Sequence, residues 1–230
     1  MGDIRKHLAF FTRRDRDFWH LYFCAPDLAT LRQEVTALPS LRTEPVAIDL
    51  VGGGTNLEDL VGAVEAAGFR RYAQLLRLAR SSQPGRVQSS SENAEVVWAE
   101  QADRQAIMDL LECSFDRYAD QLPMPYEIEA AISARQIQVV RCKEVVAALL
   151  FFETQGLTST IRYWVVAERF RSHRFGSALM HQYFAAQSAV RRFLLWVTAD
   201  NENAVLKYRH YGYNPDGLID HVLVNEMIPR

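Results

Sequence analysis

The chain has 230 residues, 49% of them hydrophobic, with 26 basic and 28 acidic side chains and a formal net charge of −2 at pH 7. This apolar content excludes a chain that is disordered as a whole. The near-neutral charge argues against nucleic acid as a partner, because neutralising phosphates needs clustered Lys and Arg. The length suits one large domain or two smaller ones, each with a core.

The cysteines and the hydropathy pattern bear on the compartment. Cys24, Cys113 and Cys142 are scattered and odd in number, which favours buried free thiols over a disulfide framework or a zinc site, so no metal is expected. The N-terminal segment has too short an apolar run and too many charges for a signal peptide. No apolar run is long enough to span a bilayer. We therefore expect a cytoplasmic protein without a membrane partner, and leave a homodimer open.

The N-terminal part alternates strand and helix patterns. We expect, in chain order, a strand over 19–25, a helix from Asp27 to Leu38, a strand over 45–51, a helix over 56–67 that stops at Gly68-Phe69, and a strand over 72–78. The segment 81–93, SSQPGRVQSSSEN, is polar and without periodicity, which is typical of a linker. It would separate a domain over 1–80 from a larger one over 94–230.

Downstream of the linker the pattern predicts an α+β domain. We expect, in chain order, a strand over 95–99, a helix capped by Asp103, a helix over 126–134, strands over 137–141, 145–153 and 159–166, a helix opening near Gly176, a strand, a helix closed by Gly212 and a last strand. A helix pair, an antiparallel meander and a strand–helix–strand–helix–strand ending form an α+β layout.

A basic loop joins the strand that ends at Val166 to the helix that opens near Gly176. Its charged side chains are Arg169, Arg171, His173 and Arg174. A helix N-terminus presents unpaired N–H groups and the positive end of the helix dipole, and small residues such as Gly176 and Ser177 allow close approach. The pattern predicts a site for a phosphorylated ligand.

The order and spacing of these residues resemble the acyl-CoA-binding core of the GNAT superfamily of N-acyltransferases. The stretch from Arg171 to Gly176 stands where that family has an Arg/Gln-x-x-Gly-x-Gly/Ala loop. The family's next block, Asn-x-x-Ala-x-x-x-Tyr-x-x-x-Gly-Phe, is met by Asn201, Ala204, Tyr208, Gly212 and Tyr213. Arg174 departs from the pattern by replacing the first loop glycine. Either the loop is reshaped, or this position does not need left-handed geometry.

The resemblance implies a GNAT-like mixed sheet flanked by helices. It implies transfer of an acetyl or other short acyl group from acetyl-CoA, or another acyl-CoA, to a primary amine of a small molecule or peptide. Backbone groups at the strand end would pair with the pantetheine arm, and the loop would hold the pyrophosphate. The cofactor-binding residues expected are Val165, Val166, Ala167, Arg171, His173, Arg174, Phe175, Gly176, Ser177, Asn201 and Tyr208.

The resemblance also assigns catalytic roles. Tyr208 would protonate the departing thiolate, although a core aromatic is its other interpretation. Asn201 would contact the cofactor arm, although an N-cap is its other interpretation. The general base is not evident: Glu153 is the candidate named, and Tyr163, Glu112 or a water chain are alternatives. The acceptor groove is expected around 115–127 and 216–220, where five acids would favour a cationic amine: Asp116, Asp120, Glu127, Asp216 and Asp220.

The N-terminal segment repeats part of this pattern. PVAIDLVGGGTNLEDLVGAVEAAGF echoes FLLWVTADNENAVLKYRHYGY as a strand, an Asn-headed helix and a Gly-aromatic pair. We interpret 1–80 as a degenerate, smaller half-copy of the fold without a basic phosphate loop and with Val64 at the tyrosine position. The alternative is an unrelated αβ segment whose Gly68-Phe69 only ends a helix. Two other functions stay open: a non-catalytic acyl-CoA-binding sensor or scaffold, motivated by Arg174, and a nucleic-acid partner protein.

Overall fold

The computed structural model describes residues 9–25, 27–35, 44–82 and 94–225. The chain forms two compact units, the first from Met1–Arg77, Val197–Val205 and Pro215–Arg230, the second from Leu78–Trp196 and Leu206–Asn214. The units therefore alternate along the chain. The division into domains over 1–80 and 94–230 remains a prediction, and most of the expected linker lies outside the described residues.

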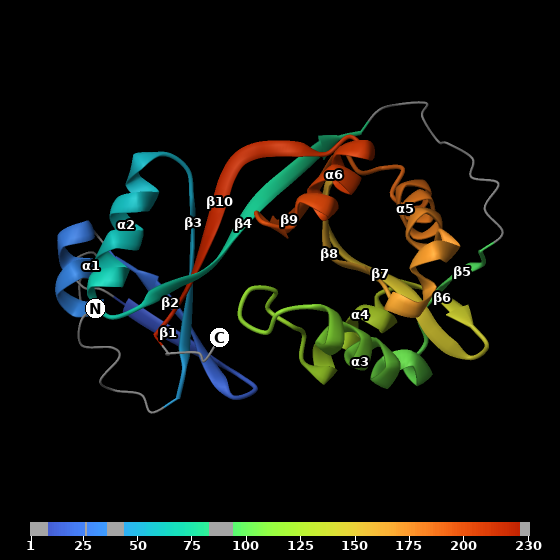
Figure 1. Cartoon of the computed structure of the whole chain (residues 1–230), viewed down its shortest axis with the longest axis horizontal. Helices are drawn as coiled ribbons and strands as arrows, with labels where there is room; N and C mark the ends of the chain where they lie inside the picture. Colours follow the sequence, from blue (N-terminus) through green and yellow to red (C-terminus); the bar gives the residue numbers. More distant parts are fainter. Residues whose placement is uncertain (1–8, 26, 36–43, 83–93, 226–230) are drawn as a thin grey trace. The chain divides into compact units, whose positions relative to one another are not determined.

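Unit 1 is an αβ layer structure. It contains β1 (Ala9–Asp15), β2 (Phe18–Cys24), α1 (Leu28–Val35), β3 (Val46–Gly52), α2 (Thr55–Ala66), the first part of β4 (Arg70–Ser81) and most of β10 (Asn214–Val224) (Figure 1). β1 and β2 pair antiparallel, β2 and β3 parallel, and β3 and β10 antiparallel. The elements expected over 19–78 are present within a few residues, while β1 was not expected.

One apolar cluster forms the core of unit 1. Val61 and Val64 lie one turn apart on α2 and pack with Ile48 and Leu50, which alternate along β3. Leu31 of α1 joins the same cluster, so both helices cover one face of these strands. Asp27 caps α1 as expected, since its Oδ1 accepts the Thr30 N–H at 2.7 Å. The expected end of this helix at Leu38 lies outside the described residues.

The internal repeat has a counterpart in hydrogen bonding. After α2, the N–H of Phe69 donates to the Val64 carbonyl at 3.4 Å; after α6 (Glu202–His210), the N–H of Tyr213 donates to the Tyr208 carbonyl at 3.1 Å. Each aromatic follows a glycine with positive φ, 94° at Gly68 and 84° at Gly212. Both helices thus end in the same six-residue capping arrangement, with Val64 at the position of Tyr208.

Unit 2 holds the meander and the helices around it. Its elements are the end of β4, β5 (Val96–Trp98), a 3₁₀ turn (Gln101–Asp103), α3 (Arg104–Ser114), α4 (Pro125–Ser133), β6 (Ile137–Cys142), β7 (Val145–Gln155), β8 (Thr158–Val166), η4 (Glu168–His173), α5 (Phe175–Ala186), most of β9 (Arg192–Thr198) and the end of α6. β5 to β8 pair antiparallel in succession, and β9 runs parallel to β8.

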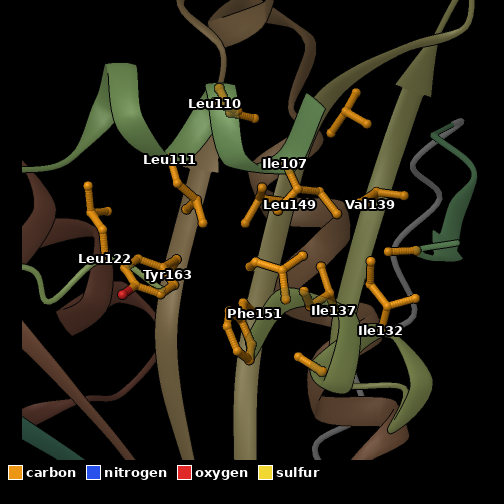
Figure 2. Packing of buried hydrophobic residues seen from close by; sticks show 14 residues of the cluster. Ile107, Leu110, Leu111, Leu122, Ile132, Ile137, Val139, Leu149, Phe151 and Tyr163 are labelled. Carbon is orange, nitrogen blue, oxygen red and sulfur yellow. The ribbon is translucent and has the colours of Figure 1, made fainter. Parts of the chain in front are cut away.

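The unit 2 core lies between α3, α4 and the meander. Ile107 and Leu111 of α3 face Val139, Leu149 and neighbouring side chains of β6 to β8 (Figure 2). The spacing of four residues on the helix and of two on the strands brings these apolar faces together. The cluster buries Tyr163 of β8 and so fixes the face that this strand turns inward.

Two expectations are wrong in detail. Asp103 does occupy the N-cap position of α3, but its side chain makes no capping hydrogen bond to that helix: the carboxylate accepts the Glu100 N–H at 2.7 Å and pairs with Arg141 at 2.6 Å. The cysteines are not buried thiols, since Cys24 and Cys113 are exposed and Cys142 is partly so. Cys24 and Cys142 end strands, where burial is lost. In the described part of the chain no helix is long and apolar enough to cross a membrane.

Candidate functional site

A β-bulge marks the middle of β8. Phe151 of β7 pairs with Tyr163, and the next residue, Phe152, pairs with Ile161, so Arg162 is the extra residue. A bulge bends its strand and increases the local twist. The pairing of β8 with β9 ends at the same place, at Ile161↔Leu195, although β8 continues to Val166 and β9 to Thr198. Beyond the bulge, β8 therefore presents a backbone edge that β9 does not pair.

The basic loop carries the chain from the end of that edge to a helix N-terminus. Val165 and Val166 close β8, and Ala167 begins the loop, its N–H donating to the Ala147 carbonyl at 2.9 Å. The rings of Phe170, His173 and Phe175 lie within 5.3–6.1 Å of one another and shape the loop. The strand end and the helix start are thus held by short-range contacts.

Arg174 has left-handed backbone geometry, with φ 56° and ψ 16°. The position therefore has the left-handed conformation that glycine adopts readily, so the explanation that this position does not need left-handed geometry is wrong. A reshaped loop stays a prediction. A non-glycine residue pays strain there. Arg174 is also the N-cap of α5: its carbonyl accepts the N–H groups of Ser177 and Ala178 at 3.0 and 3.2 Å. Phe175 and Gly176 follow, at positions whose N–H groups have no acceptor within a helix.

Gly176 has a packing reason for lacking a side chain. A Cβ there would lie 3.1 Å from Cζ2 of Trp164 and 3.4 Å from Cγ2 of Val166. The Trp164 indole N–H also donates to the Gly176 carbonyl at 3.2 Å. The glycine thus lets α5 begin directly against the side chains of β8. Because of this packing, a bulky substitution at Gly176 would disturb the fold as well as any ligand.

The basic side chains of the loop face solvent. Arg171 is 71% exposed and lies 3.8 Å from the exposed Glu168, a pair that contributes little to stability. His173 and Arg174 are exposed as well, and His173 contacts the Ser172 hydroxyl at 3.3 Å through Nδ1. These side chains remain accessible to an anion at the helix N-terminus.

Helix α6 places the two residues of the Asn–Tyr block on different turns. Asn201 caps the helix, since its Oδ1 accepts the Ala204 N–H at 3.1 Å; Asn203 is not the cap. Tyr208, in the last turn, is buried and lies 5.4 Å, ring to ring, from Trp164 of β8. Burial, and next the charge of Asp120, raise the pKa of the Tyr208 phenol well above its ordinary value. The phenol therefore keeps its proton in the resting protein.

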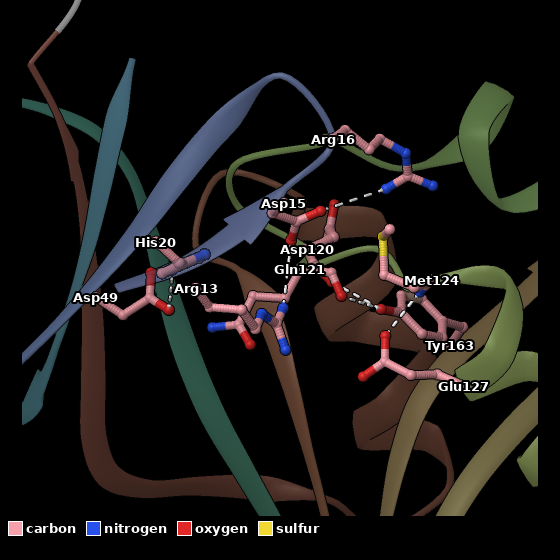
Figure 3. A network of polar contacts seen from close by, with 10 residues as sticks. All are labelled: Arg13, Asp15, Arg16, His20, Asp49, Asp120, Gln121, Met124, Glu127 and Tyr163. Atoms are coloured by element: carbon pink, nitrogen blue, oxygen red, sulfur yellow. Dashed lines mark hydrogen bonds and ion pairs between the residues drawn. The ribbon is translucent and has the colours of Figure 1, made fainter. Parts of the chain in front are cut away.

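The base candidates differ in surroundings. Glu153 of β7 is exposed and accepts a 2.8 Å hydrogen bond from Arg162, the bulged residue. The Tyr163 hydroxyl is buried and donates to the carbonyls of Asp120 and Gln121 at 2.9 and 2.8 Å (Figure 3). Burial raises the pKa of Tyr163 to about 12, so it does not serve as a base near neutral pH. Glu112 lies exposed on α3.

The acids of the expected acceptor groove mostly have structural partners. Asp116 accepts the N–H groups of Tyr118 and Ala119. Glu127 accepts the N–H of Met124, a contact drawn in Figure 3. In unit 1, Asp216 pairs with Arg77 and Asp220 is buried. The sequence analysis missed the bulge and the role of Trp164, because nothing in TSTIRYWVV indicates a bulge or distinguishes Trp164 from any other aromatic residue of a strand.

Burial, and next the charge of Asp49, raise the pKa of Asp220 to about 7. Asp49 itself lies 2.9 Å from the buried His20, the pair drawn in Figure 3. These three side chains belong to the sheet of unit 1, and none of them is on the loop or helix start described above. The groove expected from the segments 115–127 and 216–220 stays a prediction.

Comparison with known proteins identifies the class to which this arrangement belongs. Residues 104–213 match the model of the acetyltransferase (GNAT) family. This match covers slightly less than half of the chain, and over residues 104–213 it confirms the resemblance seen in the sequence. A search of curated protein sequences gives no significant match.

Solved structures extend the likeness to most of the chain. A GCN5-related N-acetyltransferase from Sphaerobacter thermophilus matches with a TM-score of 0.67 and 14% identity, covering 96% of this chain and 76% of its own. A tandem GNAT protein from the clavulanic acid biosynthesis pathway matches with a TM-score of 0.62 and 11% identity, covering 93% of this chain and 76% of its own. A GCN5-related N-acetyltransferase from Kribbella flavida matches with a TM-score of 0.60 and 17% identity, covering 90% of this chain and 80% of its own. The expected fold class is confirmed.

Proposed function

We propose that this protein transfers an acetyl or other short acyl group from acyl-CoA to a primary amine of a small molecule or peptide. The observation that carries the proposal is the coincidence, in unit 2, of an unpaired strand edge with a helix N-terminus. β8 leaves its pairing with β9 after Ile161, and the chain continues through a basic loop into α5. An amide-containing arm can add to such an edge like a strand, and a pyrophosphate fits the helix start.

The covalent structure of acyl-CoA, with phosphates at one end and the thioester at the other, sets the direction in which the ligand would lie along β8. Phosphates at Phe175 to Ser177 place the start of the pantetheine arm near Val166 and Ala167, because the loop joins these segments. The arm then runs back along β8 toward Arg162, a stretch of five residues or about 16 Å. The thioester therefore lies at the bulged end of the free edge. Arg171 and Arg174 would add charge to the phosphate site, and His173 would add a hydrogen-bonding side chain.

Tyr208 is suited to act as the general acid. It lies beside Trp164, in the middle of the free edge, and its phenol stays protonated until negative charge develops on the sulfur. Asn201 would contact the arm from the start of the same helix, in addition to capping it. Glu153 remains a proposed base, because its carboxylate accepts a hydrogen bond from Arg162, the bulged residue of β8.

Unit 1 would act without a cofactor of its own. β3 leads to α2 through Gly52, Gly53 and Gly54 with no arginine or histidine, so no basic loop stands before that helix. We propose that it is a degenerate half-copy of the fold. A cytoplasmic location and a homodimer remain proposals. A non-catalytic acyl-CoA-binding sensor or scaffold remains the alternative function, although Arg174 has the left-handed geometry that a glycine at this position would adopt.

Thioester consumption tests the proposal. Free thiol release from acetyl-CoA would be followed with a panel of primary amines: a polyamine, an amino sugar and a lysine-containing peptide. We expect amine-dependent thiol release with at least one class. Thermal stabilisation by acetyl-CoA without thiol release would support a sensor, and the absence of both would contradict the assignment.

A further inference from the structure

The loop between α3 and α4 carries a carboxylate that the sequence does not distinguish from its acidic neighbours. Asp120 is only partly exposed, and its Oδ2 accepts the Asp116 N–H at 2.8 Å. Its Oδ1 accepts no hydrogen bond from the described residues. One oxygen is therefore held and the other is open, an arrangement that aims the open oxygen in a fixed direction.

The same loop is fastened to the strand that carries the free edge. The backbone carbonyls of Asp120 and Gln121 both accept a hydrogen bond from the Tyr163 hydroxyl (Figure 3). Tyr163 is next to Arg162, the bulged residue of β8. Gln121 has φ 45°, a strained conformation that the two hydrogen bonds help to hold. The Asp120 carboxylate is thus positioned from β8, at the end where the thioester lies in the proposed function.

Asp120 also influences the proposed general acid. Its charge is the second cause, after burial, of the raised pKa of the Tyr208 phenol. Burial raises the pKa of Asp120 to about 6. The hydrogen bond from the Asp116 N–H lowers this pKa, and the charge of Asp116 raises it. Two groups with such different proton affinities beside one reacting bond are typical of an acid–base pair.

We infer that Asp120 is the general base of the reaction: its Oδ1 takes a proton from the substrate ammonium group at the bulged end of β8. The inference rests on the proposed function. The neutral amine then attacks the thioester carbon, the C–S bond breaks, and its electron pair goes to sulfur. Tyr208 gives its proton to that sulfur and regains one from the nitrogen as the amide forms. Asp120 finally releases its proton to water, so the net products are the amide, CoA and one proton.

The test is the pH dependence of kcat/KM for the fastest amine of the panel. In the wild-type protein we expect kcat/KM to rise with pH through about 6, the value for Asp120. Asp120→Asn retains an oxygen to accept the Asp116 N–H, and should lower kcat/KM at pH 7 by about a hundredfold while leaving the Kd for acetyl-CoA unchanged. Its rise should move toward the pKa of the amine itself, about 10 for an alkyl amine.

Among the described residues of unit 2, the titratable groups that interact electrostatically with Asp120 are Asp116 on its own loop, Tyr163 on β8 and Tyr208 on α6. Asp109→Asn, which removes an exposed carboxylate from α3, is the matched control and should leave the profile unchanged. Asp120→Glu should retain the rise near neutral pH at reduced rate, which keeps the test valid if the Asn variant folds poorly.

Three results would overturn the inference. Wild-type-like rates for a folded Asp120→Asn would remove Asp120 from the chemistry while leaving acyl transfer intact. Loss of the rise in Glu153→Gln, with Asp120→Asn unaffected, would assign the base to Glu153 instead. No turnover by the wild-type protein would contradict the proposed function itself, and the role of Asp120 with it.

Discussion

The Trp164 indole occupies the space that a side chain at Gly176 would need, since a Cβ at Gly176 would lie 3.1 Å from Trp164 Cζ2. The Trp164 ring also contacts the rings of Tyr208 and Tyr211, with ring centroids 5.4 and 5.8 Å away. The start of α5, the free edge of β8 and the end of α6 are therefore packed through one aromatic side chain.

This contact gives a prediction about stability. Gly176→Ala should lower the free energy of unfolding by about 1 to 2 kcal/mol, because the added methyl group overpacks the contact with Trp164 by more than the helix gains. Gly62→Ala, in the middle of α2 with nothing within 4 Å of the new atom, should raise it by about 1 kcal/mol. Urea unfolding measures both. A stabilising Gly176→Ala would show that the start of α5 has room for a methyl group beside Trp164, and would contradict the prediction.

Arg174 separates backbone strain from charge. Arg174→Gly should raise the free energy of unfolding by about 1 kcal/mol by relieving the left-handed conformation. It should also weaken acetyl-CoA binding, more so at low salt, because a cation leaves the phosphate site.

Arg135 provides the matched control for this variant. It is also exposed and left-handed, with φ 53°, but it follows α4. Arg135→Gly should give a similar gain in stability with no change in binding. Tighter binding by Arg174→Gly, measured by calorimetry, would contradict a role for the Arg174 charge and would favour the sensor alternative.

Tyr208→Phe tests the proposed general acid. The ring and its contact with Trp164 remain, so the Kd for acetyl-CoA should not change. Turnover should fall by about a hundredfold, because the phenol acts only as charge develops on sulfur. Tyr183→Phe removes a different buried hydroxyl, which donates to Ser159 at 2.8 Å, and should cost stability without lowering kcat. Normal kcat in a folded Tyr208→Phe would make the residue structural.

The pair of Asp103 and Arg141 should make stability depend on acid pH. Burial alone would raise the pKa of Asp103, but hydrogen bonds from Arg141 and the Glu100 N–H lower it below its ordinary 3.8. A lowered folded pKa stabilises the protein above the unfolded value, and this contribution is lost as pH falls through the folded value. Asp103→Asn should therefore cost about 1 to 2 kcal/mol at pH 7 and progressively less below about pH 4.

The ion pair of Arg104 and Glu129 is the comparison for this experiment. Both side chains are more than 40% exposed, so Glu129→Gln should change the free energy of unfolding by less than about 1 kcal/mol at any pH. Urea unfolding at pH 7, 5 and 3 checks both variants. An equal cost for Asp103→Asn at pH 3 and pH 7 would show that its effect is not electrostatic.

Local signals explain what the sequence predicted well. The alternation around Ile48, the helical spacing of Val61 and Val64, and the Gly-aromatic helix ends after α2 and α6 each depend on neighbours in the chain, and all are present. β1 was missed because its outward side chains include charges, and its strand character comes from pairing with β2.

The site was only partly predictable, because some of its features depend on contacts between residues that are far apart in the sequence. The order of the loop and the Asn–Tyr block is a linear pattern, but the bulge at Arg162 appears only when β7 and β8 are set in register. The position of Asp120 depends on hydrogen bonds to Tyr163, 43 residues away in sequence. Five acids of similar appearance could not be ranked until their partners were known.

Amide hydrogen exchange with and without saturating acetyl-CoA tests the central claim most directly, because it reports on the backbone groups proposed to hold the ligand. We predict slower exchange in peptides that cover 162–167 and 174–178, the free edge of β8 and the first turn of α5, and no change in peptides that cover β3 and α2. Saturated binding with protection confined to other segments, or no protection anywhere, would contradict the account.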